Sequence, residues 1–268
     1  MDTARVTAPR TGYAYLDDES PPLAFAHRGG AMHPDLPGLE NTMAAFRHAV
    51  SLGYRYLETD VHATVDGVLL AFHDDVLDRV TDGEGALGAL THEQVDAFRI
   101  GGSEGIPTLA QLFDELADVR FNIDLKSEAA VPLLARFLDE RDAHDRVLVG
   151  SFSPRRLRHF RRITRGRVAT SANPLEVVAF RFLPSGRLAD LVTRGRVSAL
   201  QIPYRQRGLT VTTAGLVRRA HAVGKHVHSW TVDDPAEMIL LLDRGVDGLM
   251  TDRTDILRDV LAQRGQWT

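Results

Sequence analysis

Residues 121–151 read FNIDLKSEAAVPLLARFLDERDAHDRVLVGS, and this stretch decides the fold class. Apolar residues alternate over Phe121–Leu125, which is typical of a strand. They recur with helical spacing over Ala129–Glu140, and a second apolar run follows at Val147–Ser151. A strand, a helix and a strand in close succession form the unit from which parallel sheets are built. The stretch therefore predicts an α/β protein with a parallel sheet.

The same alternation continues on both sides of this stretch. Further strands are expected at Leu23–Ala26, Tyr56–Val61, Val68–Phe72, Val168–Ser171, Ala199–Ile202, Val227–Thr231 and Gly248–Thr251. Further helices are expected at Thr42–Leu52, Leu109–Leu116, Pro154–Ile163, Leu175–Phe182, Thr213–Val223 and Pro235–Leu242. A single α/β barrel typically occupies about 250 residues. The chain has 268 residues, so we predict one TIM (β/α)8 barrel.

Nine predicted strands are one too many for an eight-stranded barrel. The segment Val61–Gly67 is too short for a helical crossover between parallel strands. Either one strand is misassigned or the extra strand lies outside the barrel. Residues 74–106, after the third strand, break the alternation and are expected to form a small insertion, which is either a functional loop or a plain surface excursion. We place an N-terminal extension at 1–22 and the barrel domain at 23–268.

Composition excludes several classes of function. The net charge of −4 argues against a nucleic-acid partner. The chain has no cysteine, so disulfides, thiolate metal sites and a catalytic thiol are excluded. The first 22 residues contain no apolar run of signal-peptide length, and no membrane-spanning or amphipathic membrane stretch is evident. We expect a cytoplasmic protein without stable membrane insertion; its oligomeric state stays open.

Polar residues stand where the first four predicted strands end. They are His27 and Arg28, Glu58 and Asp60, His73, and finally Asp124 and Lys126. In a parallel barrel the carboxyl ends of the strands face one mouth, where active sites form. Two imidazoles, three carboxylates and two cations are therefore expected at one place.

The three acidic residues form a candidate metal site. Glu58 and Asp60 are two positions apart on one strand, so their side chains point to the same side, and Asp124 can face them from the fourth strand. Carboxylates that converge in this way repel one another unless a cation lies among them, and such oxygen ligands suit Ca²⁺ or Mg²⁺. The alternative is an acidic strand end solvated at the rim.

The two histidines form a candidate acid/base pair. One histidine after an apolar strand is more often structural, but His27 and His73 lie beside cations and carboxylates. Cleavage of a phosphodiester needs a base that activates the nucleophile and an acid that protonates the leaving alcohol. Arg28 and Lys126 would bind the phosphoryl oxygens, Arg28 with two parallel hydrogen bonds. Gly29 and Gly30 would let the backbone approach the phosphate.

An ordered series of short motifs gives the chain a specific resemblance to a known protein family. It comprises Ala26–Gly30, Glu40–Thr42 with Phe46, Glu58–Val61, Thr64–Gly67, His73–Asp74, Arg79, Ile106–Leu109, Asn122–Lys126, Ser151–Phe152, Ser229–Val232 and Gly245–Gly248 with Thr251–Asp252. From about Leu23 to about Thr254 the chain resembles the glycerophosphodiester phosphodiesterase family. The resemblance implies a TIM barrel of the phospholipase C-like type. It also implies cleavage of glycerophosphodiesters to glycerol 3-phosphate and an alcohol with a divalent cation.

The resemblance also implies roles for individual residues. His27 and His73 become the catalytic pair; the metal ligands become Glu58, Asp60 and Asp124; Arg28 and Lys126 become phosphate contacts. Trp230 would wall the substrate pocket, or else be an aromatic of the core or rim. Asn41 either caps the following helix or orients the site. Two departures put substrate preference in doubt: Asp124 stands where the family more often has Glu, and the link 31–39 is longer than usual.

Three functions follow as alternatives. The first is a metal-dependent glycerophosphodiester phosphodiesterase that acts on a small-molecule substrate. The second is a lysophospholipase D-like hydrolase of lysophospholipids, which must admit an acyl chain; an exposed apolar rim near the insertion would support it. The third is a catalytically silent binding barrel, since a fold does not imply a function. The retained histidines and acids argue against the third.

Overall fold

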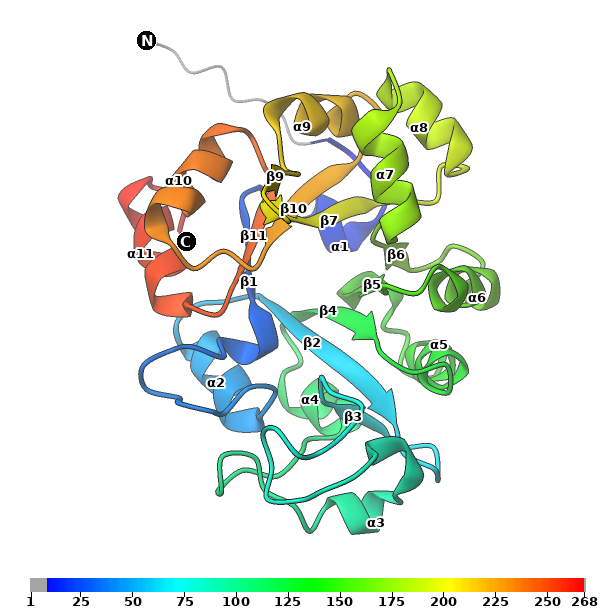
Figure 1. Cartoon of the computed structure of the whole chain (residues 1–268), viewed down its shortest axis with the longest axis vertical. Helices are drawn as coiled ribbons and strands as arrows, with labels where there is room; N and C mark the ends of the chain where they lie inside the picture. The colour runs from blue at the N-terminus through cyan, green and yellow to red at the C-terminus, as the bar shows by residue number, and fades with distance from the viewer. Residues whose placement is uncertain (1–8, 268) are drawn as a thin grey trace.

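Eight parallel strands form a ring in the computed structural model, which describes residues 9–267 (Figure 1). Neighbours follow the order β6-β5-β4-β2-β1-β11-β10-β7, and a parallel bridge between Ser171 and Ala199 joins β6 to β7. The strands are β1 Leu23–Ala26, β2 Tyr56–Ala63, β4 Arg120–Leu125, β5 Val147–Gly150, β6 Ala169–Thr170, β7 Ala199–Pro203, β10 His226–Trp230 and β11 Gly248–Thr251. The predicted TIM barrel is confirmed.

The ninth predicted strand lies outside the ring. Strand β3, Leu69–Ala71, runs antiparallel to the end of β2, with Val61 opposite Ala71. The turn between them is tight because the Gly67 amide donates to the Thr64 carbonyl, and Gly67 adopts a φ of 85° that favours glycine. Of the two explanations for the extra strand, the one that places it outside the barrel holds. The expectation that the third strand runs parallel to its neighbours was wrong.

Helices surround the ring. Those predicted from sequence are α2 Met43–Ser51, α4 Leu109–Glu115, α5 Ala130–Glu140, α6 Pro154–Thr164, α7 Pro174–Phe182, α9 Ala214–His221 and α10 Pro235–Asp243. Sequence reasoning missed α1 Ala14–Asp17, α8 Gly186–Val192, α11 Thr254–Gln263 and a hairpin of β8 Arg205–Gln206 and β9 Leu209–Thr210. No described helix is long and apolar enough to cross a membrane.

The barrel has separate apolar cores inside and outside the ring of strands. The large outer core fills the space between strands and helices. The inner core packs Tyr15 and Leu16 of α1 against Phe25 of β1 and Tyr56 of β2. The Tyr56 hydroxyl donates to the Tyr15 carbonyl at 3.0 Å. The segment before β1 therefore closes the amino-terminal end of the barrel and leaves the carboxyl end for the site.

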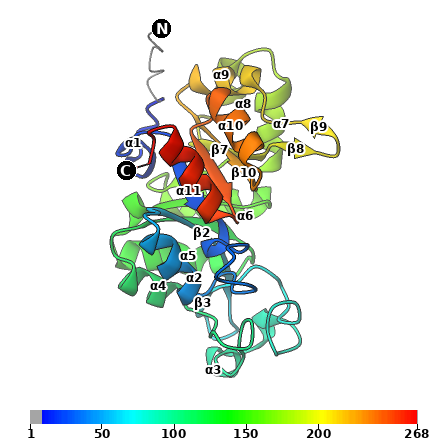
Figure 2. The same cartoon turned by 90° about the vertical axis from the view of Figure 1, so that its left-hand side faces the viewer.

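The segment between β2 and α4 forms an excursion with its own small core. It contains β3 and the short helix α3, His92–Val95, and it projects from the barrel in Figure 2. Its buried apolar side chains are Leu70, Phe72, Leu77, Leu87, Val95, Ile100 and Ile106. Because Leu70 and Phe72 belong to this core, the excursion includes β3 and starts before residue 74.

Candidate active site

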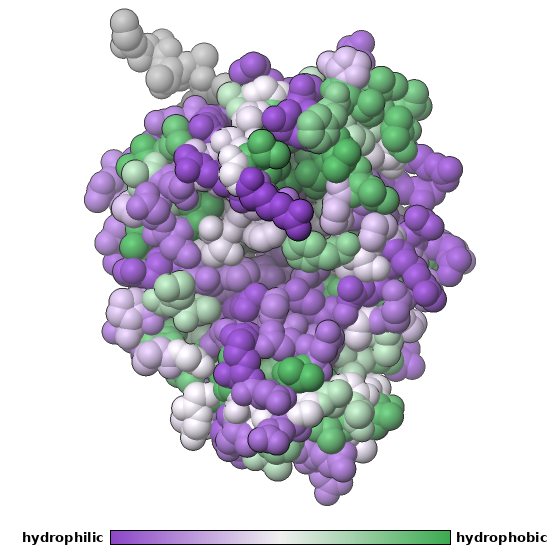
Figure 3. All heavy atoms as spheres, in the orientation of Figure 1, coloured by the Kyte–Doolittle hydropathy of each residue, from purple (hydrophilic) through white to green (hydrophobic). Residues whose placement is uncertain are grey.

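A pocket of about 430 Å³ opens at the carboxyl ends of the strands. In Figure 3 it is the hydrophilic hollow at the centre of the face. The side chains that the sequence predicted to act in catalysis, metal binding or substrate binding all line it: His27, Arg28, Glu58, Asp60, His73, Asp124, Lys126 and Trp230. The structure thus brings together residues that are up to 203 positions apart in the chain.

His27 begins the short helical turn η1, His27–Gly29, directly after β1. Its Nδ1 lies 2.6 Å from the Asp252 carboxylate, and its Nε2 lies 3.8 Å from Glu58. Burial alone would lower the pKa of His27, but the Glu58 and Asp252 carboxylates outweigh it and raise the pKa to about 9. Asp252 therefore holds one ring nitrogen, and the other faces the carboxylate cluster.

The three predicted ligands share one region but differ in their partners. Asp60 and Asp124 are opposite each other on β2 and β4, and the Lys126 ammonium lies 3.0 Å from Asp60 and 2.7 Å from Asp124. Among the described residues, no lysine or arginine side chain lies within 4.0 Å of Glu58. Burial and the charge of Asp60 raise the pKa of Glu58 to about 7. Among residues 9–267, the ion-pair partner of this carboxylate is thus the His27 ring and no lysine or arginine.

Arg28 is held by three acids. Its backbone amide donates to Glu58 at 3.1 Å, and its side chain lies 3.1 Å from Glu40 and 3.2 Å from Asp60. Arg28 adopts a φ of 50°, a conformation that costs a non-glycine residue energy. This turn aims the guanidinium into the pocket, where it lowers the pKa of Asp60 together with Lys126, although burial acts in the opposite direction.

His73 reaches the mouth by a route that the sequence did not predict. Because β3 is antiparallel, its end runs back toward the barrel, and the Phe72 amide donates to the Asp60 carbonyl at 2.9 Å. The His73 Nδ1 contacts the carboxylate of Asp74. Burial alone would raise the pKa of Asp74, but hydrogen bonds from Arg79 and His73 lower it to about 2. His73 therefore has a partner that is ionised at neutral pH.

A chain of ion pairs joins the excursion to the barrel. Arg79 donates to Asp74 at 2.6 Å and to Glu40 at 2.7 and 2.8 Å. Glu40 in turn accepts from Arg28 at 3.1 Å. The position of His73 is thus coupled to that of Arg28 through three charged side chains.

The structure decides between the two roles considered for Asn41. Thr42 is the N-cap of α2, because its hydroxyl accepts from the Ala45 amide at 3.1 Å. Asn41 is 1% exposed; it donates to Asp60 at 3.3 Å and accepts from the Thr59 hydroxyl at 2.8 Å. Asn41 therefore orients a site carboxylate.

Gly29 and Gly30 meet a packing requirement of their own. Both have positive φ, of 81° and 94°. A Cβ at Gly29 would lie 2.8 Å from the Cβ of Ala45, and one at Gly30 would lie 2.9 Å from the Thr254 side chain. Close packing of η1 against α2 and α11 thus requires these glycines, whether or not a phosphate approaches them.

Sequence reasoning assigned no role to several residues that shape the site. Glu40, Asp74, Arg79, Asn122 and Asp252 were noted only as parts of motifs, and Gln201 was not considered. Asn122 lines the pocket and accepts from Gln201 at 2.6 Å. Asp252 follows the last strand directly. The rule that selected His27 and Asp124, a polar residue where a parallel strand ends, would have found it.

A further group of possible metal ligands lies away from the mouth pocket. His33, Asp35 and His48 offer ligand atoms that all lie within 4.8 Å of one another, so they could hold an ion. The two rings have centres 4.3 Å apart, and their Nε2 atoms are separated by 3.3 Å. These three residues come from the long link 31–39 and from α2, and none of them lines the mouth pocket.

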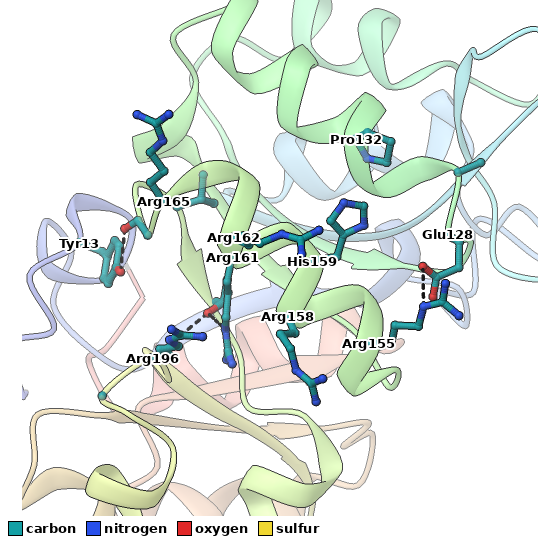
Figure 4. Close-up of a pocket in the computed structure, with 15 residues that line it drawn as sticks. Tyr13, Glu128, Pro132, Arg155, Arg158, His159, Arg161, Arg162, Arg165 and Arg196 are labelled. Carbon is teal, nitrogen blue, oxygen red and sulfur yellow. Dashed lines mark hydrogen bonds and ion pairs between the residues drawn. The ribbon is translucent and has the colours of Figure 1, made fainter.

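A second, larger hollow lies on the outer wall beside α6. It encloses about 1110 Å³ and is lined by six arginines: Arg155, Arg158, Arg161, Arg162, Arg165 and Arg196 (Figure 4). Arg155 and Arg161 pair with Glu128 and Glu176. Within residues 9–267 the other four have no carboxylate within 4.0 Å. This arginine groove contains none of the predicted site residues.

Comparison with known proteins decides the family. The model of the glycerophosphoryl diester phosphodiesterase family matches residues 27–256. The chain belongs to this family. It is 43% identical over 248 residues to the probable glycerophosphodiester phosphodiesterase 2 of Mycobacterium tuberculosis, which covers 91% of this chain and 92% of that protein. The resemblance and the assignment as a phosphoric diester hydrolase are confirmed.

Solved structures of the glycerophosphoryl diester phosphodiesterase family have the same fold. A glycerophosphodiester phosphodiesterase from Parabacteroides distasonis superposes with a TM-score of 0.74 at 24% identity, covering 91% of this chain and 98% of that one. A phosphodiesterase from Oleispira antarctica, solved with the product sn-glycerol-3-phosphate, has a TM-score of 0.74 at 23% identity and covers 90% and 97%. At these identities the likeness establishes the fold.

Proposed function

We propose that the chain hydrolyses glycerophosphodiesters to glycerol 3-phosphate and an alcohol by two-histidine acid/base catalysis that depends on a divalent cation. One observation carries the proposal: His27 and His73 line the same pocket, and each has its Nδ1 against a carboxylate. In both rings this leaves Nε2 for the substrate.

Glu58, Asp60 and Asp124 fit a hard divalent cation as a donor set. All three are carboxylates that line the pocket, and Glu58 has no lysine or arginine side-chain partner among residues 9–267. The pKa of Glu58, raised by burial and by Asp60, reflects the excess negative charge that a cation would relieve. A bound Ca²⁺ or Mg²⁺ would stabilise the charge that develops on the phosphoryl oxygens. The donor set does not favour one of these ions over the other.

His27 is proposed as the base that accepts a proton from the glycerol 2-hydroxyl or from water. Attack by the 2-hydroxyl would give a cyclic phosphodiester, which a water must then open to give glycerol 3-phosphate. A base must be neutral, whereas the Glu58 and Asp252 carboxylates raise the pKa of His27 to about 9. Positive charge beside Glu58 would oppose this effect and return His27 toward its usual pKa near 6.5. Asp252 would then hold the Nδ1 proton and leave the Nε2 lone pair free.

His73 is proposed as the acid that protonates the leaving alcohol. Burial acts to raise the pKa of its partner Asp74, but Arg79 and His73 lower it to about 2, so Asp74 stays ionised at neutral pH and can hold the Nδ1 proton of His73. Arg28 and Lys126 would contact the phosphoryl oxygens, and their present ion pairs with the acidic cluster hold them at the pocket. Trp230 would form part of the wall.

A metal-titrated assay tests this proposal. The chelated protein is assayed on glycerophosphocholine, glycerophosphoethanolamine and a lysophospholipid while Ca²⁺ or Mg²⁺ is added. Turnover of a glycerophosphodiester that rises with the cation supports the proposal. Full turnover after exhaustive chelation would contradict the metal requirement, and no turnover of any of the three would contradict the reaction.

An apolar pocket wall favours the lysophospholipid alternative as a second candidate. Phe152, Val178, Val211 and Trp230 line one part of the pocket, and Phe152 packs edge-on against Trp230 with ring centres 5.7 Å apart. A wall of this kind can accept an alkyl chain. This apolar wall is formed by α7 and by the segments around Phe152, Val211 and Trp230, and not by the excursion, where the sequence had placed it. The lysophospholipid arm of the same assay tests this candidate.

A further inference from the structure

Two neighbouring helices expose apolar stripes to solvent. On α7, Leu175 and Phe182 are 67% and 72% exposed, and Val178 lies between them. On α8, Leu191 is 74% exposed, and Leu188 and Val192 share its side of the helix. The spacings i, i+3, i+7 and i, i+3, i+4 put each set on one face of its helix. Figure 3 shows this apolar surface gathered over α7 and α8 beside the central hollow. We call it the α7–α8 face.

The hairpin of β8 and β9 adds an apolar tip to this side of the molecule. In Figure 2 it projects beyond the helices. Its tip contains Leu209, which is 71% exposed, and the exposed Arg207. Gln206, from the same hairpin, and Val178, from α7, both line the mouth pocket. The exposed apolar surface is therefore continuous with the entrance of the site.

The charges around the α7–α8 face are almost all positive. Arg181, Arg187, Arg194 and Arg207 have no carboxylate within 4.0 Å among the residues that the structure describes. The two acids of α7 and α8 are already neutralised: Glu176 pairs with Arg161, and Asp190 pairs with Lys225 at 3.1 Å. The whole chain has a net charge of −4, so this concentration of unpaired cations is local.

We propose that the α7–α8 face and the hairpin tip dock the protein on an anionic lipid membrane, with the mouth of the site beside the lipid surface. Apolar side chains rimmed by arginines bind interfaces because the apolar groups enter the acyl boundary while the cations meet the headgroups. Docking of this kind is peripheral and needs no membrane-spanning helix.

A second copy of the chain fits the face less well. A two-fold dimer brings the same patch of both subunits together. Unpaired arginines would then face unpaired arginines, and neither Glu176 nor Asp190 is free to compensate them. Negative lipid headgroups supply the missing countercharge. The membrane is therefore the occupant that the charges favour.

The consequence for substrate supply rests on the proposed function. An enzyme whose pocket opens beside a lipid surface can take a diester with an apolar moiety directly from that surface. The docking itself is measured without turnover, so the two proposals fail separately.

Sedimentation with vesicles tests the docking. The full chain is mixed with vesicles of phosphatidylglycerol and phosphatidylcholine, or of phosphatidylcholine alone, at low and high salt. We expect binding to the anionic vesicles that weakens with salt. Phe182→Ser combined with Leu191→Ser should reduce binding at least tenfold. Arg207→Glu should reduce it by about fivefold or more, given about 1 kcal/mol for each cation near an anionic surface.

Matched controls locate the contact. Val65→Ser removes an apolar side chain that is 64% exposed on the excursion and should leave binding unchanged. Arg158→Glu with Arg162→Glu reverses charge in the arginine groove and should also leave most binding intact. Phe182→Ser with Leu191→Ser, and Arg207→Glu, should both hydrolyse a soluble glycerophosphodiester at the rate of the unaltered protein, which would show that they fold.

Three results would overturn the proposal. The first is no binding to anionic vesicles at low salt. The second is binding lost with the arginine-groove variant but kept with the apolar one, which would move the anion contact to the groove. The third is a dimer of the unaltered chain in sedimentation equilibrium that Phe182→Ser with Leu191→Ser converts to a monomer, which would make the face a subunit interface.

Discussion

Replacement of Asp252 by asparagine would test how the site controls the charge of His27. Asp252 lies 2.6 Å from Nδ1, and with Glu58 it raises the pKa of His27 to about 9 although burial acts in the opposite direction. Asparagine keeps the size of the side chain but removes its charge. In the metal-free protein, Asp252→Asn should therefore lower the pKa of His27.

The magnitude follows from the size of the effect that the two acids produce. A rise in the pKa of His27 from 6.5 to about 9 corresponds to about 3 kcal/mol of preference for the imidazolium in the folded protein. Asp252 is in direct contact and Glu58 is 3.8 Å away, so each acid supplies part of it. We expect Asp252→Asn to lower the pKa by on the order of one unit, or about 1.4 kcal/mol.

The same linkage fixes how stability depends on pH. Because the pKa of His27 is higher in the folded than in the unfolded protein, His27 stabilises the folded state. This contribution to the free energy of unfolding is fully present below about pH 6.5 and is lost as the pH rises through about 9. In chelator, Asp252→Asn should therefore destabilise the protein more at pH 6 than at pH 10. With the cation and substrate present, kcat should fall about 10²–10⁴-fold, since His27 loses the partner that fixes its tautomer.

Histidine NMR titration of the chelated protein, with urea unfolding at pH 6 and pH 10, measures these effects. Asp255→Asn is the control, because Asp255 pairs with Arg253 and not with His27. An unchanged pKa of His27 in Asp252→Asn, or equal destabilisation at both pH values, would refute the reasoning.

Three further changes test individual roles. Asp60→Asn removes charge with little change in volume and should weaken divalent binding strongly, as followed by calorimetry; activity that survives both this change and chelation would exclude the metal role. Arg28→Lys should impair kcat on a glycerophosphodiester because an ammonium cannot form two parallel hydrogen bonds with the phosphate; an unchanged rate constant would make Arg28 structural. His73→Ala should lower the activity about 10²–10⁴-fold on a diester with a poor alkoxide leaving group, but far less on a p-nitrophenyl diester, whose leaving group needs little protonation. His27→Ala should be poor on both, and equal losses for the two variants on both substrates would refute the division of roles.

The sequence predicted the strands well because their apolar periods are strong, but it could not give their direction. The predicted strand Val68–Phe72 is as apolar as the barrel strands, and only the short Val61–Gly67 link indicated that it does not continue the barrel. Helix α8 was missed because its exposed face is apolar, so the polar half that marks an amphipathic surface helix is weak. The hairpin of β8 and β9 has only two residues in each strand, too few for a period.

The site was predictable to the extent that chain position alone fixes it. His27 follows β1 and Asp124 lies near the end of β4, and the barrel brings the carboxyl ends of its strands together. Glu58 lies inside β2, which extends beyond its predicted end to Ala63 and there pairs with β3. The partners that set the charge of these side chains depend on contacts made in the folded protein. Neither the ion pairs of Lys126 with two acids nor the path from Arg79 through Glu40 to Arg28 follows from spacing. Only the side-chain packing of the fold determines these contacts.

Identification of the phosphorus product tests the central claim most directly. The protein is incubated with glycerophosphocholine and a divalent cation, and the products are followed by ³¹P NMR. Cleavage by the proposed route releases choline and leaves all phosphorus in glycerol 3-phosphate, and the signal should be lost with His27→Ala. Phosphorus that appears in phosphocholine, or conversion by His27→Ala at the unaltered rate, would contradict it.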